Sequence, residues 1–374
     1  MAKIKHNLSN EKIILALFAV LVVVGIVNVI ILTNISLIAG QKTETAKPAA
    51  IDIKEIYVAG CTDCYDISRD VSEINKQNVN ATSSRTEASS PEGKSLIDKY
   101  EIRRLPALIV TGEIDKTASL SSHWAQVGTV WDDAIVIEAQ LPFYSVAEKR
   151  VVGVVYITRI VDTSCAQCTS INSIVNSFVR AGVAIGSDEQ LEFSSPQGAK
   201  LVRDFGIDQI PAVIVSADIL EYPAIAQVWD QLNATEKNGS YALHVLQPPY
   251  RSLSENRIVG LVDVIYLNDS TCTNCYNVLV HREILGTNFG IYLVNETIVD
   301  INSSAGKSIL SKHNIMLVPA FIMSPEAKYY TDLAQVWPSV GTVEKDWYVF
   351  RNVTVLGAIY KDLSTGKTIV PAGE

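Results

Sequence analysis

The chain of 374 residues is long enough for two or three ordinary domains, and its 48% apolar content excludes wholesale disorder. Charged residues make up 19% of the chain, and the formal net charge is −9. An acidic chain without a basic block is a poor partner for nucleic acid, because phosphate neutralisation needs clustered Lys and Arg. We therefore expect no nucleic-acid binding.

An apolar segment near the N-terminus is the first element along the chain. Residues 13–32 hold a single polar side chain, Asn28, and as a helix they span about 30 Å, which matches one hydrocarbon core. The apolar run continues to residue 39, and no small-x-small cleavage site follows closely. We therefore predict an uncleaved transmembrane signal anchor over residues 13–39.

The charges on either side of this segment predict its orientation. Residues 1–12 carry three lysines, whereas the polar, proline-containing linker over residues 40–49 carries two. The positive-inside rule then places residues 1–12 in the cytoplasm and the body of the chain outside it. We expect a single-pass protein of the cell membrane with extracytoplasmic domains.

Asn-x-Ser/Thr triplets agree with an exported chain. Beyond the apolar segment these triplets begin at Asn80, Asn233, Asn238, Asn268, Asn295, Asn302 and Asn352. They are candidate glycan acceptors on an exported surface, so the chain is predicted to be a glycoprotein. The alternative is that Asn, Ser and Thr simply share the same loops.

The rest of the chain repeats one domain-sized unit three times. Cys61, Cys165 and Cys272 each open a Cys-x-x-Cys pair and are separated by 104 and 107 residues. Each unit then has a Pro 45 to 47 residues later, a Gly 13 residues before that Pro and a Trp 18 residues after it. These recurring residues are Gly93, Gly198, Gly306, Pro106, Pro211, Pro319, Trp124, Trp229 and Trp337. The period indicates tandem domains over residues 50–149, 150–256 and 257–374.

Within one unit, strands and helices alternate. In the second unit the apolar run over residues 151–161 predicts a buried strand, and residues 169–182 after the cysteines have a helical pattern. Ser195 and Pro196 open a second helix, which ends before Pro211, and an apolar run then predicts a third strand. The second strand of each unit is clearest in the third unit. In the first unit it is weak, because residues 76–95 are rich in Ser, Thr and Asn, and we expect a loop or a reduced strand there. This alternation predicts an α/β sheet.

Each unit resembles a thioredoxin-fold domain. Two motifs carry the resemblance: a Cys-x-x-Cys pair after the first buried strand, and an apolar residue followed by Pro about 45 residues later, just before a strand. The resemblance implies three tandem thioredoxin-like domains after one N-terminal transmembrane helix, and prolines in the cis form beside the cysteines. The family's Trp before the first Cys is replaced by Gly60, Ser164 and Thr271, which leaves redox potential and substrate open.

The cysteine pairs predict redox-active centres. We expect each pair to lie at the N-terminus of a helix, where free N–H groups and the helix dipole favour a thiolate on the first Cys, and where the second Cys, three residues later, can attack the mixed disulfide. We assign Cys61, Cys165 and Cys272 as attacking thiols, and Cys64, Cys168 and Cys275 as resolving thiols. The alternative of purely structural bridges is weaker, because a disulfide that closes so short a loop stabilises little.

Further site residues follow from the resemblance. Pro106, Pro211 and Pro319 would hold the backbone of Leu105, Ile210 and Val318 beside the cysteines, where a substrate segment could pair as an added strand. Glu55, six residues before Cys61, would accept the proton of the resolving thiol. The alternatives are ordinary prolines at strand starts and a solvent-facing Glu.

Charges near the cysteines favour reducing or isomerising chemistry. Asp63, Asp162 and Asp269 would oppose a thiolate and raise its pKa, and no Lys, Arg or His lies within a pair. Structural zinc needs four ligands, whereas each unit offers two cysteines, and no His follows a pair as haem attachment requires. We therefore predict no metal and no cofactor.

The sequence thus predicts a membrane-anchored extracytoplasmic thiol–disulfide oxidoreductase of the reductase or isomerase type. Its partners would be the thiols and disulfides of exported proteins and an unidentified redox partner. Two alternatives stay open: a non-catalytic binding or assembly module with the same fold, and a metal-binding protein that uses the cysteine pairs.

Overall fold

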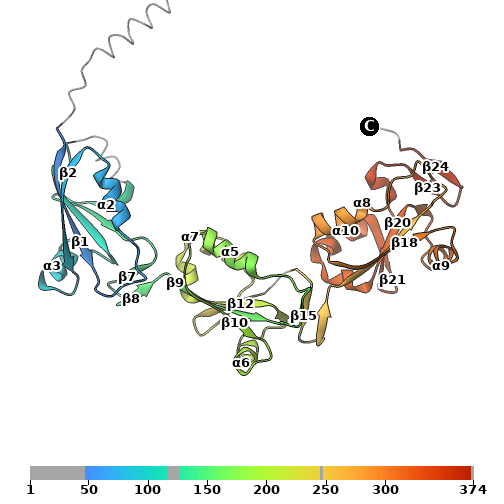
Figure 1. Cartoon of the computed structure of the whole chain (residues 1–374), viewed down its shortest axis with the longest axis horizontal. Coiled ribbons are helices and arrows are strands. Elements are labelled where there is room, and N and C mark those ends of the chain that lie inside the picture. The colour runs from blue at the N-terminus through green and yellow to red at the C-terminus, as the bar shows by residue number, and fades with distance from the viewer. Residues whose placement is uncertain (1–46, 117–123, 125, 245–246, 372–374) are drawn as a thin grey trace, which may run out of the picture. The chain divides into compact units, whose positions relative to one another are not determined.

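The computed structural model describes residues 47–116, 124, 126–244 and 247–371 (Figure 1). The predicted transmembrane segment, residues 13–39, lies outside the described residues. Within the described ranges, no helix has the length and apolar character needed to cross a membrane.

Three five-stranded sheets with the same strand order form the framework of the chain (Figure 1). The first sheet has the order β2-β1-β4-β6-β5, with β1 (Ala49–Tyr57), β2 (Val79–Glu87), β4 (Ala107–Gly112), β5 (Thr129–Val130) and β6 (Ile135–Glu138). The second has the order β10-β9-β12-β14-β13, with β9 (Val154–Val161), β10 (Ala184–Glu192), β12 (Ala212–Ser216), β13 (Thr235–Lys237) and β14 (Ser240–His244). The third has the order β18-β17-β20-β22-β21, with β17 (Val262–Asn268), β18 (Leu293–Asp300), β20 (Ala320–Met323), β21 (Gly341–Glu344) and β22 (Trp347–Phe350).

Helices connect these strands and confirm the predicted α/β class. In the second and third sheets the first two strands are parallel, and the remaining pairs are antiparallel. The helices after the first strand are α2 (Ser68–Asn75), α5 (Asn172–Arg180) and α8 (Val280–Glu283), the last continued by the π-turn η3 (Ile284–Asn288). Those after the second strand are α3 (Pro91–Lys99), α6 (Pro196–Phe205) and α9 (Ser304–Lys312). Further helices follow the third strand: η1 (Ala217–Glu221), α7 (Pro223–Ala226), η2 (Trp229–Leu232), η4 (Pro325–Tyr329) and α10 (Thr331–Val340).

The recurring glycines have a packing reason. Ser195 caps α6 by accepting the N–H of Gly198 at 3.0 Å, and the same cap recurs at α3 and α9. A Cβ on Gly198 would lie 2.1 Å from the carbonyl oxygen of Glu192, so only glycine allows the helix to start this close to the strand. The recurring tryptophans lie in the cores: Trp124 and Trp337 are buried, and Trp229 packs edge-on against Tyr241 at 5.0 Å.

Two features differ from the sequence prediction. The second strand of the first unit is the nine-residue β2, although its polar sequence predicts a loop; pairing with β1 overrides its weak strand propensity. The predicted first strand over residues 151–161 is divided at Gly153, whose φ is +92°. Only β9 belongs to the second sheet, and the part before Gly153 belongs to a separate hairpin.

Each unit has one such hairpin. Together with a short strand before the recurring proline, it forms a small three-stranded sheet that the sequence did not predict. The orders of these sheets are β3-β7-β8, β11-β15-β16 and β19-β23-β24. The strands are β3 (Arg104–Leu105), β7 (Phe143–Ser145), β8 (Arg150–Val152), β11 (Gln209–Ile210), β15 (Tyr250–Ser252), β16 (Arg257–Val259), β19 (Leu317–Val318), β23 (Tyr360–Asp362) and β24 (Lys367–Ile369). We call the strand pairs β7–β8, β15–β16 and β23–β24 the cover hairpins. The predicted starts of the second and third domains, residues 150 and 257, coincide with the second strands of two of them.

Candidate functional site

The six cysteines form three disulfides within the Cys-x-x-Cys pairs. The bonds join Cys61 to Cys64, Cys165 to Cys168 and Cys272 to Cys275, with Cα–Cα distances of 5.4 to 5.5 Å. The two residues inside each pair are exposed, and the cysteines are buried or half-buried. Each disulfide follows the first strand of its five-stranded sheet and presents an exposed turn to solvent.

The cysteines do not cap a helix, so this prediction is wrong. In the second unit the N–H of Cys168 donates to the carbonyl of Cys165 at 3.4 Å in a tight turn, and α5 begins only at Asn172. The N–H of Thr169 donates at 2.7 Å to the carbonyl of Pro249, immediately before a cover hairpin, and so does not continue a helix. Because the helix dipole falls off within one turn, α5 does not stabilise a thiolate on Cys165.

The recurring prolines are in the cis form, as the resemblance implies. The peptide bonds before Pro106, Pro211 and Pro319 are all cis. In the third unit the hydroxyl of Tyr276, the residue after Cys275, donates to the carbonyl of Pro319 at 2.6 Å. One side chain therefore connects the cysteine turn to the proline.

The backbone before each of these prolines is already paired, which corrects the expectation of a free edge for substrate. Leu105 pairs with Tyr144, Ile210 with Arg251, and Val318 with Lys361 in antiparallel ladders. The strand added at this edge is therefore the first strand of a cover hairpin from the same chain. Strands this short carry no periodic pattern, so the sequence gives little signal for them.

A buried ion pair joins the cover hairpin to the cysteine loop in the third unit. The Asp269 side chain is fully buried and lies 2.5 Å from the Lys361 ammonium group, and it accepts the N–H of Thr271 at 2.9 Å. Burial by itself would raise the pKa of Asp269, but hydrogen bonds from Lys361, Thr271 and Asn302 outweigh it and lower the pKa to about 2. Asp269 is therefore ionised at neutral pH and neutralised by Lys361.

The second unit has the same arrangement. The carboxylate of Asp162, 2% exposed, pairs with the Arg251 guanidinium and accepts the N–H of Ser164 at 2.9 Å. Burial opposes ionisation here too, but the hydrogen bonds from Ser164 and Arg251 leave the pKa of Asp162 below its ordinary value. Sequence reasoning found both acids but missed both cations, because Arg251 and Lys361 lie 89 and 92 residues further along the chain.

At the matched positions, both of which the structure describes, the first unit has no such ion pair. Val58 stands three residues before Cys61, where the other units have Asp, and Tyr144 takes the ladder position of Arg251 and Lys361. A cavity of about 420 Å³ lies here; it is lined by Val58, Tyr144, Leu105 and several polar side chains, including Lys94 and Lys149. The first site therefore differs from the other two at one pair of structurally matched positions.

Glu55 forms an ion pair with a residue of the neighbouring strand. Its carboxylate accepts from the Arg85 guanidinium of β2 at 2.9 Å. The matched residues make similar pairs between parallel strands, Arg159 with Asp188 and Tyr266 with Glu296. A role for Glu55 as proton acceptor therefore rests on the resemblance alone.

A buried histidine in the third unit is a residue that sequence reasoning missed. His281 is 3% exposed; its Nε2 lies 3.0 Å from the Tyr276 hydroxyl, and its ring packs against Phe321 and Phe350 at 4.6 and 4.7 Å. Burial lowers the pKa of His281 to about 4 and raises the pKa of Tyr276. The histidine is therefore neutral above that pH and holds the tyrosine that follows Cys275.

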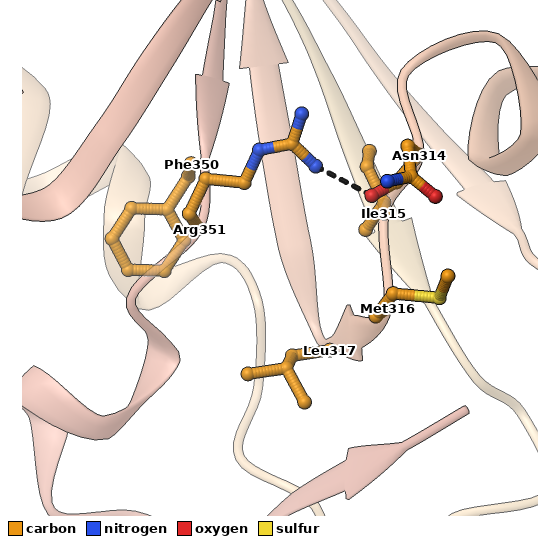
Figure 2. Close-up of a pocket in the computed structure, with 6 residues that line it drawn as sticks. All are labelled: Asn314, Ile315, Met316, Leu317, Phe350 and Arg351. Carbon is orange, nitrogen blue, oxygen red and sulfur yellow. Dashed lines mark hydrogen bonds between the residues drawn. The ribbon is translucent and has the colours of Figure 1, made fainter. Parts of the chain in front are cut away.

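A second cavity adjoins the strand before Pro319. It has a volume of about 400 Å³ and is lined by Asn314, Ile315, Met316, Leu317, Phe350 and Arg351 (Figure 2). Figure 2 shows the Arg351 guanidinium reaching the Asn314 carbonyl, a hydrogen bond of 2.7 Å. The same side chain also pairs with Glu344 and donates to the His313 carbonyl, so its charge is compensated.

Comparison with known proteins gives weak similarities only. No family model and no curated protein matches the chain. Among solved structures, full-length ERdj5 is 10% identical over 75% of this chain and 41% of its own, with a TM-score of 0.14. Human ERp44 is 10% identical over 74% of this chain and 76% of its own, with a TM-score of 0.13. The N-terminal domain of alkylhydroperoxide reductase AhpF from Enterococcus faecalis is 16% identical over 46% of this chain and 81% of its own, with a TM-score of 0.14. The chain thus spans about two fifths of the length of ERdj5.

Because these scores are far below 0.5, the fold assignment stands on the chain's own geometry. In each unit a disulfide follows the first strand of the five-stranded sheet, and a cis-proline precedes the neighbouring central strand of the same sheet. That combination defines a thioredoxin-like domain. The part of the chain that the structure describes contains three such domains in tandem.

Proposed function

We propose that the protein is a thiol–disulfide oxidoreductase whose redox-active centres are the three Cys-x-x-Cys pairs. The observation that carries the proposal is that all six cysteines form these pairs, each closed as a disulfide under an exposed turn. A bridge that closes so short a loop adds about 2 kcal/mol by the chain-entropy model, which is little for domains with their own cores. Exchange chemistry explains the repetition of the pair better than stability does.

The reaction has two displacement steps. In the reduced protein the thiolate of Cys61 attacks one sulfur of a substrate disulfide, forms a mixed disulfide and releases the other substrate sulfur as a thiolate. The Cys64 thiolate then attacks the Cys61 sulfur and releases the second substrate thiol. Two electrons pass to the substrate, and the Cys61–Cys64 disulfide is restored until an external dithiol reduces it. The same steps apply to the other two pairs.

The proposed setting is the outer side of a membrane. The apolar segment over residues 13–39, its lysine flank and the Asn-x-Ser/Thr triplets support a single-pass protein with extracytoplasmic domains. Its partners there are thiols and disulfides outside the cytoplasm, those of exported proteins among them, and a redox partner that reduces the pairs. Protease accessibility of the domains in sealed cells tests this setting: digestion only after lysis would contradict it.

A non-catalytic binding or assembly module is the second candidate. It is favoured by the cover hairpins, because they occupy the backbone edge before each proline.

Turnover measurements separate the two candidates. The purified chain, with dithiothreitol as donor, should reduce a small aromatic disulfide, and the combined variant Cys61→Ser, Cys165→Ser, Cys272→Ser should lose this activity. The single variant Cys64→Ser, first reduced and then freed of dithiothreitol, should instead accumulate a mixed disulfide on Cys61 when the aromatic disulfide is added, and mass spectrometry detects it. Equal turnover in the unaltered chain and the combined variant would contradict the enzyme, as would no turnover at all.

A further inference from the structure

We propose that the second and third sites act on low-molecular-weight disulfides and thiols, because ion-paired cover hairpins keep extended polypeptides away from them. This inference rests on the proposed function and names the substrate class of two of its three sites. The first site has no ion pair at the matched described positions, Val58 and Tyr144, and serves as the comparison within the same chain.

The ladder pattern shows that the backbone edge before the proline is fully used. In an antiparallel pair, hydrogen-bonded and non-hydrogen-bonded residue pairs alternate. The N–H of Leu253 donates to the Asp208 carbonyl at 2.8 Å, which makes these two residues a hydrogen-bonded pair. Because the two types alternate, Ile210 and Arg251, two positions further along the ladder, are a hydrogen-bonded pair as well. In the third unit the N–H of Leu363 donates to the Met316 carbonyl at 2.8 Å, so Val318 and Lys361, two positions along the ladder, are likewise a hydrogen-bonded pair. A substrate strand would have to displace the hairpin first.

The cover hairpin is also held from the cysteine side. The residue after each second cysteine donates its N–H to the residue just before the hairpin, from Thr169 to Pro249 at 2.7 Å and from Tyr276 to Ile359 at 2.9 Å. In the third unit the hairpin's second strand reaches the attacking sulfur, since Thr368 Oγ1 lies 3.9 Å from Cys272 Sγ. Access to the sulfur is then left to the exposed side of the turn, which a small disulfide can approach end-on.

The ion pairs make displacement of these hairpins unfavourable. If β23 moved away, Asp269 would lose Lys361 and stay behind as a buried charge. The same holds for Asp162 when Arg251 leaves, and Arg251 also packs over the Phe193 ring at 5.7 Å. Val58 and Tyr144 carry no such charge in the first unit, so its hairpin opens more easily and leaves that site to polypeptides.

Full-length chains that retain one cysteine pair and carry Ser at the other four positions test this inference. Each chain, once reduced, is mixed with bis(2-hydroxyethyl) disulfide or with a long unstructured peptide that contains one disulfide. The readout is the ratio of the peptide rate to the small-disulfide rate, which cancels differences in thiol reactivity. We expect this ratio to be about tenfold or more lower for the second and third sites than for the first.

Removal of the ion pair should relax the restriction. In the chain that retains Cys272 and Cys275, Lys361→Gln should raise the ratio by about tenfold or more, whereas Lys367→Gln, which changes an exposed lysine on the same hairpin, should leave it unchanged. Hydrogen exchange checks the unaltered chain: amides of β19 and β23 should stay protected during turnover of the small disulfide. Equal ratios at all three sites, or loss of this protection, would overturn the inference alone. No reaction with either disulfide would overturn the proposed function with it.

Discussion

The substitution Asp269→Asn measures how strongly the buried ion pair holds the cover hairpin of the third unit. An amide resembles the protonated carboxyl in shape and charge, so the pKa of Asp269 gives the size of the effect. Lowering that pKa from 3.8 to about 2 corresponds to about 2 kcal/mol of stability at neutral pH, because one pKa unit is worth about 1.36 kcal/mol. The folded pKa lies below the unfolded one, so this contribution is present above about pH 4 and is lost as the pH falls towards about 2.

The expected result is a local one. About 2 kcal/mol corresponds to about 30-fold faster hydrogen exchange where exchange occurs through hairpin opening. Mass spectrometry of peptides covering residues 359–369 at pH 7 would detect it. The control is Asp346→Asn, an exposed acid in the same unit, which should change nothing.

A double-mutant cycle decides whether the pair itself is responsible. Lys361→Gln alone should cost at least as much as Asp269→Asn, because it leaves a buried carboxylate without its cation. The double variant should cost less than the sum of the two single changes. Additive effects, or unchanged exchange in Asp269→Asn, would refute the reasoning.

Two further predictions concern packing and acid stability. Gly198→Ala puts a methyl group 2.1 Å from the Glu192 carbonyl oxygen, so it should lower the free energy of unfolding, measured by urea titration, by about 1–3 kcal/mol. The control Gly286→Ala adds its methyl group in open space and should leave the free energy of unfolding unchanged. His281 has a folded pKa of about 4, below its ordinary 6.5, so its neutral form stabilises the fold above about pH 6.5 and about 3 kcal/mol is lost as the pH falls to about 4. His281→Gln should flatten this loss in urea titrations at several pH values, and an unchanged acid profile would contradict the assignment.

The repeated residues made much of the fold predictable. Cys, Gly, Pro and Trp recur at nearly constant offsets, and the structure gives three sheets of one strand order. Gly198 and Ser195 also have the local roles that a helix start requires. Such positions are predictable because the reason for each residue lies within a few neighbours along the chain.

The parts that sequence reasoning missed depend on distant contacts. The helix after Cys168 begins only at Asn172 because the N–H of Thr169 donates to the carbonyl of Pro249. The sequence around Thr169 does not indicate that acceptor. The strands of the cover hairpins have two or three residues each, too few for a periodic pattern. Arg251 and Lys361 are ordinary basic residues until the fold brings them to an acid about ninety residues earlier.

The three units provide their own comparison of how the acid and the cation depend on each other. At the position three residues before the first cysteine the chain has Val58, Asp162 and Asp269, and at the facing hairpin position it has Tyr144, Arg251 and Lys361. A buried carboxylate without a cation is costly, and so is a buried cation without a carboxylate, so the two charges are stable only together. The unit without the acid also lacks the cation, as this requirement demands. The substitution Val58→Asp should therefore destabilise the first unit when introduced alone and be rescued by Tyr144→Arg.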